Sequence, residues 1–569
     1  MKENKTAQSS PITSSEKTAS FNNFNWPVKW AILFLVILTI ILLAPFVTKA
    51  FHMDDPLFIW AAKNIQSHPD NPYGLYLNWY GNKMGMWEVT KNPPLACFYI
   101  AFVAFLFGWS EVVLHIAFLI PAIAAVLGTY FLAGRLCSKP LLAGIMALGM
   151  PVFLISGTTI MCDIMMLAFW VWAVVLWMRG LDKNEHITLA IASILIAMSA
   201  LTKYFGMSLL LLLPLYAIIK QRKIGLWIIY LVIPIIILLL YQWKTQMLYG
   251  RGLLLDAGAY AIEFRNPQEI GRVIKGIIGI AFTGGCLAVI LFYFSFLWSK
   301  RTLFIQFFIL IALIIGMACL QKIGSFDLHS PNGPKWLFII QFCLAFIAGA
   351  NVLVLAATAL WEQKMDSDSI LLFCWIFGTF FFATFVNWCI NGRSILPMVP
   401  ALAILLVRRI DKMNMHWKNP RILLWPSVPA ICLALLTVQG DFALANSACH
   451  AAAQISSKYG KESGKLWFQG HWGFQYYMEL NGGEASERNK LNLVPGDRLV
   501  IPENTCYIFP LPENISKHII EISEIPVKAL VTTMNREAGA GFYSQIWGPL
   551  PFVLGRVPPE RYGILDIDR

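Results

Sequence analysis

The sequence is poor in charged residues. Only 13% of its 569 residues are Asp, Glu, Lys or Arg, whereas 57% are hydrophobic, and the mean hydropathy is +0.62. A water-soluble fold of this size could not cover so much apolar surface, so the composition excludes an ordinary soluble protein. The net charge of +12 comes from short Lys and Arg clusters between apolar runs. Such clusters orient membrane helices, so the charge indicates no nucleic-acid partner.

Several catalytic signatures are also absent. The chain has no His-Glu-x-x-His, no Cys-x-x-Cys, no Gly-x-x-x-x-Gly-Lys phosphate loop and no Gly-x-Ser-x-Gly. Hydrolytic zinc chemistry and ATP use are therefore unsupported. Most of the 11 cysteines lie in apolar runs, where a thiol behaves as a small hydrophobe. Only Cys449 and Cys506 fall in the polar C-terminal region. The sequence does not decide whether these two cysteines form a disulfide.

Apolar runs of about 17 to 25 residues match the hydrocarbon thickness of a bilayer. We predict an all-α polytopic membrane bundle of about 13 transmembrane helices over residues 29–440, followed by a soluble α/β domain over 441–569. Residues 1–28 are polar and are expected to be cytoplasmic. The expected spans are 29–50, 112–134, 141–158, 163–179, 187–202, 205–219, 224–242, 273–298, 302–320, 336–360, 370–388, 394–407 and 422–440.

The apolar run at 93–109 decides the topology. It is short and begins with two prolines, so it suits a helix lying on the membrane as well as a span. If it lies on the surface, the densest Lys and Arg clusters all face the cytoplasm, as the positive-inside rule requires. That arrangement places residues 51–111 in an outer loop and puts residues 441–569 on the same outer face.

Three carboxylates stand at this predicted outer face. Asp54 and Asp55 follow the first span directly, and Asp163 begins a later one. Ionisable groups so close to hydrocarbon are candidates for function. A structural role competes, because Pro56 suits the first turn of a helix that Asp55 would cap, and Asp163 could cap a helix as well. Neighbouring side chains diverge, so Asp54 is the carboxylate free to face a substrate.

Three cations are predicted on the same face. Lys203 separates two spans, Arg393 follows another, and Lys91 stands beside Asn92 in an outer loop rich in Trp and Tyr. Positive charge outside runs against the orientation rule, so Lys203 and Arg393 are candidates for holding an anion. Lys91 suits either an interfacial anchor or a phosphate contact. Carboxylates and cations together suit a reaction that expels a phosphate.

These ordered features resemble the GT-C superfamily of polytopic glycosyltransferases, especially the bacterial relatives of protein O-mannosyltransferases and of the lipid A aminoarabinose transferase. The resemblance covers about residues 29–410 and rests on Asp54-Asp55, Asn92-Pro93-Pro94-Leu95, Asp163, Leu201-Thr202-Lys203, and Arg393 before Leu396-Pro397. The stretch from Gly470 to Tyr477 also resembles the outer domains of such enzymes. Two departures matter: the usual Asp-Glu pair is Asp-Asp here, and Lys-Pro-Pro becomes Asn92-Pro93-Pro94.

The resemblance implies an enzyme that moves a sugar from a polyprenyl-phosphate donor to a hydroxyl acceptor on the non-cytoplasmic face, with inversion. It implies Asp54 as the base, with Asp55 supporting it. Donor phosphate or acceptor would be bound by Asp163, Lys203, Arg393, Lys91 and Asn92. No cofactor is certain; a divalent metal could share the leaving-group charge, although no metal-specific ligand spacing is present. The sugar, the carrier and the acceptor, whether protein, lipid or glycan, stay open.

Two other functions stay open at this point. A transporter or flippase of a lipid-linked glycan would also use many spans and a few charges, but no internal repeat is found and the charges gather at one face. A non-catalytic membrane assembly subunit would use residues 441–569 as an interaction module, yet it leaves the Asp pair unexplained. The expected location is a bacterial inner membrane, with the active face and the C-terminal domain in the periplasm.

Overall fold

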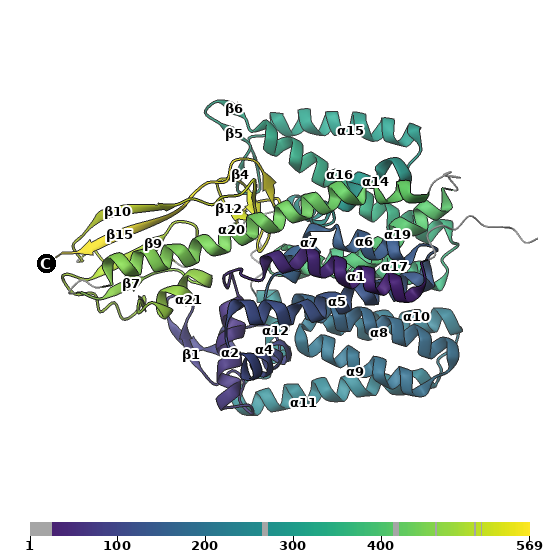
Figure 1. The fold of residues 1–569 in the computed structure, drawn as a ribbon, viewed down its shortest axis with the longest axis horizontal. Helices are drawn as coiled ribbons and strands as arrows, with labels where there is room; N and C mark the ends of the chain where they lie inside the picture. The colour runs from purple at the N-terminus through teal and green to yellow at the C-terminus, as the bar shows by residue number, and fades with distance from the viewer. Residues whose placement is uncertain are drawn as a thin grey trace, which may run out of the picture.

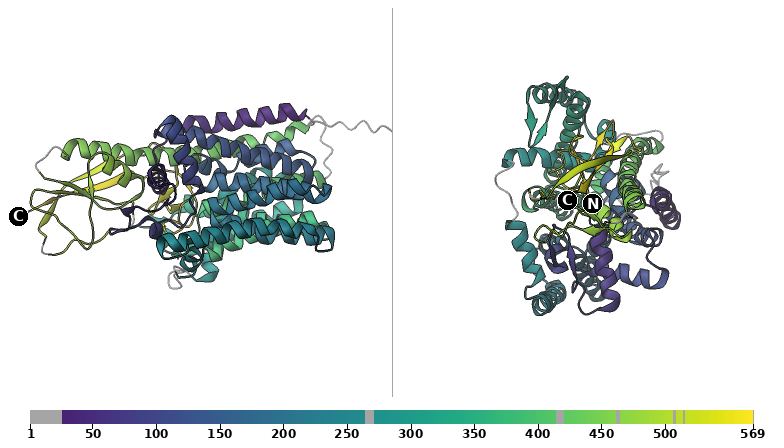
Figure 2. Two further views of the ribbon diagram at one scale, coloured as in Figure 1. Left: turned by 90° about the horizontal axis from the view of Figure 1, so that it is seen from below. Right: turned by 90° about the vertical axis from the view of Figure 1, so that its left-hand side faces the viewer.

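The computed structural model describes residues 26–263, 271–413, 420–460, 464–505, 508–513 and 515–568. Most of the predicted cytoplasmic N-terminus lies outside these residues, and so does Cys506, whose disulfide with Cys449 the sequence leaves undecided. A bundle of helices forms one end of the molecule, and a narrower region with most of the strands extends from it along the long axis (Figure 1). Figure 2 shows the same elongated outline from a second direction.

In the described residues, nine helices are long and apolar enough to cross a membrane, and two bent helix pairs raise the number to eleven. The nine contain α1 (Val28–Leu43), α5 (Glu111–Leu136), α8 (Asp163–Lys183), α10 (Leu209–Gln221), α11 (Val232–Tyr249), α15 (Lys300–Cys319), α16 (Trp336–Glu362), α17 (Ser367–Phe381) and α20 (Ser427–Tyr459). The bent pairs are α6 (Pro140–Leu148) with α7 (Pro151–Gly157), and α13 (Arg272–Cys286) with α14 (Val289–Leu297). The predicted multi-pass helical bundle is confirmed.

The number of candidate spans is lower than the predicted 13 or so for a simple reason. Two predicted spans, 187–202 and 394–407, correspond to α9 (His186–Thr202) and α19 (Met398–Lys412), which have 17 and 15 residues. At 1.5 Å per residue, helices of this length reach only about 23 to 26 Å, short of a hydrocarbon core of about 30 Å. Both helices still pack within the bundle, and α19 is buried along most of its length.

The doubtful run at 93–109 forms α4 (Leu95–Phe107), which has 13 residues and is too short to count as a candidate span. It lies beside α2 (Asp55–Ser67) at the end of the bundle that faces the strand-containing region (Figure 1). The Gln66 side-chain amide donates to the Ala101 carbonyl at 3.0 Å and ties the two helices together. The other short helices are α3 (Met86–Val89), α12 (Leu253–Glu263), α18 (Gly392–Ile395) and α21 (Trp472–Leu480).

The C-terminal region is built on a five-stranded mixed sheet, in the order β10, β15, β9, β7, β8. These strands are β7 (Leu466–Phe468), β8 (Glu484–Ala485), β9 (Arg498–Pro502), β10 (Lys517–Ile525) and β15 (Glu560–Ile567). β7 pairs in parallel with β8 and β9, whereas β15 is antiparallel to both β9 and β10. Helix α20 runs without a break past residue 441, so one helix belongs to both the bundle and this region (Figure 1).

Short two-stranded pairs complete the fold. They are β1 (Tyr76–Asn78) with β2 (Lys83–Gly85), β3 (Lys322–Ile323) with β4 (Phe326–Asp327), β5 (His329–Ser330) with β6 (Gly333–Pro334), β11 (Val531–Thr532) with β14 (Val553–Leu554), and β12 (Met534–Asn535) with β13 (Ala540–Gly541). The first three pairs lie in loops between bundle helices, and the last two belong to the C-terminal region.

A fully buried ion pair joins three distant parts of the chain. Lys49 Nζ lies 2.5 Å from Asp441 Oδ2, and neither side chain is exposed. The Asp441 carboxylate also accepts hydrogen bonds from the Tyr543 hydroxyl at 2.8 Å and from the Thr533 hydroxyl at 3.0 Å. The end of the first span, helix α20 and the C-terminal region are therefore held at one point. Just beyond it, the Phe51 amide donates to the Tyr477 hydroxyl at 2.8 Å.

We expect Asp441→Asn to lower the free energy of unfolding by about 3 to 5 kcal/mol, because it leaves the Lys49 ammonium buried and unpaired. Adding Lys49→Met to that variant should recover more than half of the loss, since the introduced amide oxygen can still accept from Tyr543. Glu484→Gln is the control: it breaks an exposed pair with Lys465 at 2.8 Å and should change little. Detergent-solubilised unfolding curves measure all three. Equal losses from Asp441→Asn and Glu484→Gln would contradict the prediction.

Candidate functional site

Asp55 fastens the loop that carries Asp54. Its Oδ2 accepts from the His52 amide at 2.8 Å, and its Oδ1 accepts from the Ile160 amide at 2.9 Å. The carboxylate therefore joins the turn before α2 to the turn before α8, and it does not cap its own helix. Burial raises the pKa of Asp55 to about 7, although Lys49 and the two amides oppose the shift. A carboxyl group that is fully buried and held on both oxygens acts as a positioning group.

Asp54 is the more accessible carboxylate of the pair. Its Oδ2 lies 2.9 Å from Arg393 Nη2, and its side chain is 30% exposed. The residue before it, Met53, has a φ of 49°, a left-handed conformation that costs energy for a side chain of this kind. Arg393 belongs to α18, where the Asn391 side chain caps the helix by accepting from the Ser394 amide at 2.8 Å. The ion pair is thus set by two fixed turns.

Asp163 and Lys203 make a second ion pair, with Nζ 2.5 Å from Oδ1. Asp163 is the first residue of α8 and is buried, while Lys203 directly follows α9 and is 17% exposed. The second carboxylate oxygen of Asp163 is buried and has no hydrogen-bond partner among the described residues. Asp163 does not cap α8, so the capping interpretation fails for it as well.

Arg393 connects the two ion pairs. Its Nη1 contacts the sulfur of Met161, two residues before Asp163. Burial alone would lower the pKa of Arg393, but the charges of Asp54 and Asp163 hold this pKa above its ordinary value. Its Nε has no hydrogen-bond partner among the described residues. We call Asp54, Asp163, Lys203 and Arg393 the charge cluster; it brings four of the seven sequence candidates together with unused donor and acceptor atoms.

Lys91 and Asn92 have partners outside the charge cluster. Lys91 Nζ is 2.6 Å from Asp256 Oδ2 in α12 and 5.2 Å from the centre of the Tyr260 ring. The backbone carbonyl of Asn92 accepts from the Tyr73 hydroxyl at 2.7 Å. In the described part of the chain, neither side chain forms an ion pair or a hydrogen bond with the charge cluster. The local sequence could not reveal this, because Asp256 is 165 residues away from Lys91.

The carboxylates do not form a shared set of metal ligands. Asp54 is paired with Arg393, Asp163 with Lys203, and Asp55 with two backbone amides. Within the described ranges, one group of three side chains comes close enough to hold an ion. It consists of His518, Asp566 and Asp568, beside the paired strands β10 and β15. Because Arg393 and Lys203 already occupy the carboxylates of the charge cluster, its side chains do not offer the shared oxygen ligands that a divalent ion requires.

Sequence reasoning missed the buried polar residues behind the cluster. Tyr543 donates to Asp441, and its ring centre lies 6.0 Å from the Arg393 guanidinium. His52 Nε2 lies 3.9 Å from Asp441 Oδ1, and burial lowers the pKa of His52 to about 4, so its imidazole is neutral. Opposite charges at the ends of two apolar runs, Lys49 and Asp441, were a usable signal. Nothing in the local sequence pointed to Tyr543.

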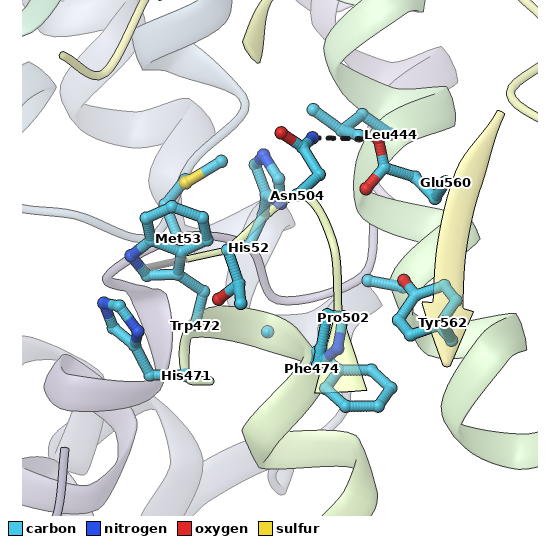
Figure 3. Close-up of a pocket in the computed structure, with 13 residues that line it drawn as sticks. His52, Met53, Leu444, His471, Trp472, Phe474, Pro502, Asn504, Glu560 and Tyr562 are labelled. Atoms are coloured by element: carbon cyan, nitrogen blue, oxygen red, sulfur yellow. Dashed lines mark hydrogen bonds between the residues drawn. The ribbon is translucent and has the colours of Figure 1, made fainter. Parts of the chain in front are cut away.

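A cavity borders the loop that carries Asp54. His52 and Met53 line it from the loop, Trp472 and Phe474 from the start of α21, and Glu560 and Tyr562 from β15. In Figure 3, His52, Met53 and Trp472 face Glu560 and Tyr562 across the opening. Glu560 Oε1 accepts from the Asn504 amide at 2.9 Å, and burial raises the pKa of Glu560 to about 8. The cavity wall thus carries a carboxyl group that is protonated near neutral pH.

Part of the chain matches a known protein family. Residues 91–243 match the model of the dolichyl-phosphate-mannose-protein mannosyltransferase family. This part of the chain is therefore similar to that glycosyltransferase family. The match favours the enzyme over the transporter and the assembly subunit. The matched range includes Lys91, Asp163 and Lys203, whereas Asp54 and Arg393 lie outside it. No curated protein sequence matches this chain at a significant level.

Solved structures with a similar fold were also found. The oligosaccharyltransferase of Archaeoglobus fulgidus, tethered with an acceptor peptide, is 12% identical with a TM-score of 0.46 over 82% of this chain, which spans 65% of that enzyme's length. ArnT from Cupriavidus metallidurans bound to undecaprenyl phosphate is 12% identical with a TM-score of 0.41, covering 84% of this chain and 94% of ArnT. Apo ArnT is 14% identical with a TM-score of 0.38, covering 84% and 93%.

We expect Glu560 to make the glycosyltransferase less stable as pH rises. Because the folded-state pKa of about 8 lies above the ordinary value of 4.5, the folded protein holds a proton that the unfolded chain releases. This contribution is complete below the ordinary value and is lost as pH rises toward the folded one. Between about pH 6 and about pH 9, wild type should lose on the order of 3 kcal/mol relative to Glu560→Gln. Parallel unfolding curves with pH would contradict this expectation.

Proposed function

We propose that the glycosyltransferase moves a sugar from a polyprenyl-phosphate donor to an acceptor hydroxyl on the non-cytoplasmic face, with Asp54 as the base. The observation that carries the proposal is the position of Asp54, a partly exposed carboxylate 2.9 Å from the Arg393 guanidinium, whose side chain is 17% exposed and whose charge also interacts with Asp163. In-line displacement puts the base and the leaving phosphate on opposite faces of the sugar, so this contact must open when the donor binds and free Asp54 for the acceptor and Arg393 for the phosphate. The family match supports a lipid-linked donor.

The proposed reaction is a single displacement. The acceptor oxygen attacks the anomeric carbon while Asp54 takes the hydroxyl proton, and the bond between the anomeric carbon and the phosphate oxygen breaks on the opposite face. Polyprenyl phosphate leaves with the electron pair of that bond. Arg393 and Lys203 stabilise the charge that develops on the phosphate, because fixed cations in a poorly solvated site need no reorganisation. Inversion at the anomeric carbon follows from attack opposite the leaving group.

Asp163 and Asp55 support this reaction without taking the proton. Asp163 holds the Lys203 ammonium at 2.5 Å, so a phosphate would meet a cation that is already oriented. Asp55 fixes the backbone on both sides of Asp54 through its two amide contacts. Asp55 is one methylene shorter than the glutamate of the usual Asp-Glu pair. Its carboxylate is nevertheless long enough to reach both the His52 amide and the Ile160 amide.

Basic residues lie at the helix ends that are away from the site, and this supports a non-cytoplasmic position for the site. Helix α8 begins at Asp163 in the charge cluster and ends at Lys183, and α5 begins at Glu111, which accepts from Tyr477 of α21 at 3.0 Å, and ends near Arg135. Arg and Lys therefore gather at the far end of the bundle from the cluster. The positive-inside rule makes that end cytoplasmic and gives the cluster and C-terminal region the periplasmic side.

Asp54→Asn should reduce sugar transfer by about 10²- to 10⁴-fold, because the amide cannot accept the acceptor proton. The assay follows radiolabelled sugar from a panel of polyprenyl-phosphate sugars into membrane extract, using purified folded protein. Asp256→Asn is the matched control, since it removes an aspartate paired with Lys91 outside the charge cluster. Transfer by Asp54→Asn at the wild-type rate would show that Asp54 is not the base.

Removal of a cluster cation should weaken donor binding. Arg393→Gln and Lys203→Gln are each expected to raise the concentration of polyprenyl phosphate that half-inhibits transfer by about tenfold, equivalent to about 1.4 kcal/mol. Lys91→Gln removes the same charge from the pair with Asp256 and should raise it less than threefold. A larger effect of Lys91→Gln than of the cluster variants would move the phosphate site to Lys91.

A further inference from the structure

A short segment of the C-terminal region holds the turn that directly precedes Arg393. The Gly392 amide donates to the Phe542 carbonyl at 2.7 Å, and the Gln545 amide donates to the Ile390 carbonyl at 2.9 Å. The side-chain oxygen of Gln545 in turn accepts from the Ile390 amide. The segment and the turn are 155 residues apart in sequence at this last contact. Hydrogen bonds from the C-terminal region therefore fix the backbone from which Arg393 extends.

Both backbone polar groups of Ile390 are bonded to one residue, Gln545. Ile390 is fully buried, so its amide and carbonyl need partners within the protein. Removal of the Gln545 side chain would leave the Ile390 amide unsatisfied unless the turn moves. The turn cannot move closer to the segment, because a Cβ built on Gly392 would already lie 2.4 Å from the Phe542 ring. Loss of the Gln545 side chain should therefore loosen the turn.

In the described part of the chain, few other contacts fix the direction of the Arg393 side chain. Its contact with Asp54 must open when the donor binds, and its Nε lacks a hydrogen-bond partner among the described residues. Its Nη1 contacts the sulfur of Met161, a weak acceptor, and its guanidinium lies 6.0 Å from the Tyr543 ring centre. Tyr543 belongs to the same segment as Gln545. The position of the turn therefore determines where the guanidinium can reach.

We propose that Gln545 is a positioning residue for the donor: it holds the turn before Arg393, and so it holds Arg393 where the donor phosphate binds. The proposal rests on the proposed function, because that function assigns the phosphate to Arg393. A cation that is held in place before binding loses less conformational freedom when the phosphate arrives. Phosphate affinity should therefore depend on how firmly the turn is held. Gln545 acts through the Ile390 backbone, whereas the contact with phosphate belongs to Arg393.

Gln341 of α16 provides the matched control. Its side-chain oxygen accepts from the Leu554 amide at 2.7 Å, and its side-chain amide donates to the Leu554 carbonyl at 3.0 Å. Like Gln545, it is half-buried and joins the bundle to the C-terminal region through backbone groups. Its contact is with β14 and not with the turn before Arg393. Gln545→Leu and Gln341→Leu thus each remove a glutamine that bridges the same two regions, and unfolding curves compare their stability.

The probe is farnesyl phosphate, a short polyprenyl phosphate, and calorimetry measures its binding to detergent-purified full-length protein. Gln545→Leu should raise the dissociation constant by about fivefold, and Gln341→Leu should leave it within about twofold of wild type. Farnesol, which lacks the phosphate, should bind wild type and Gln545→Leu equally. Arg393→Gln alone should raise the dissociation constant of farnesyl phosphate by about tenfold. Adding Gln545→Leu to Arg393→Gln should cause no further loss, because the arginine through which Gln545 acts is absent.

Unchanged farnesyl phosphate binding by Gln545→Leu would overturn the proposal, and so would an equal loss in the wild-type and Arg393→Gln backgrounds. If Gln545→Leu does not fold, Gln545→Asn, whose amide is one methylene shorter, replaces it in the same comparison. If Arg393→Gln binds as tightly as wild type, the phosphate site of the proposed function is wrong, and the positioning role falls with it. If Asp54→Asn transfers sugar at the wild-type rate while the binding results hold, only the base assignment is wrong, and the role of Gln545 stands.

Discussion

The buried pair of Lys49 and Asp441 is the constraint on which the outer face depends. Two charges have left water completely, and their separation of 2.5 Å, with Tyr543 and Thr533 donating to the carboxylate, offsets that cost. The pair joins residues 392 apart in sequence and so fixes where the first span ends relative to α20. From that point to Asp54 the chain has only four intervening residues, and Asp55 holds the far side. Loss of either charge would release the loop that carries the proposed base.

The C-terminal region is therefore part of the candidate site. Tyr543 connects the buried ion pair with the charge cluster. Its hydroxyl donates to Asp441, and its ring centre lies 6.0 Å from the Arg393 guanidinium. The Gly392 amide donates to the Phe542 carbonyl at 2.7 Å, which places the turn before Arg393 directly against the C-terminal region. The helical bundle alone therefore does not position Arg393, the proposed phosphate-binding arginine. The position of Arg393 in the charge cluster depends on contacts with the C-terminal region.

The local sequence predicts where the charged residues lie relative to the helices, but it does not predict which residues they pair with. Asp55 and Asp163 begin helices, and Lys203 and Arg393 stand at helix ends, because polar residues interrupt apolar runs there. Pairing depends on how helices pack: Lys91 meets Asp256 in α12, which the outer-loop sequence alone does not show. The domain boundary at 441 falls inside α20 for a related reason, since helical periodicity continues while hydropathy changes. Patterns over a few residues report burial and turns, whereas contacts between distant residues arise only from the packed structure.

Residues 51–55 place the two carboxylates of the Asp pair in different surroundings. Asp54 is partly exposed and lies 2.9 Å from Arg393, whereas Asp55 is buried and accepts hydrogen bonds from the His52 and Ile160 amides. A substrate hydroxyl can approach the first carboxylate but not the second, whose two oxygens are already used to hold the backbone. The proposed base role therefore falls to Asp54, and Asp55 determines where the Asp54 side chain lies.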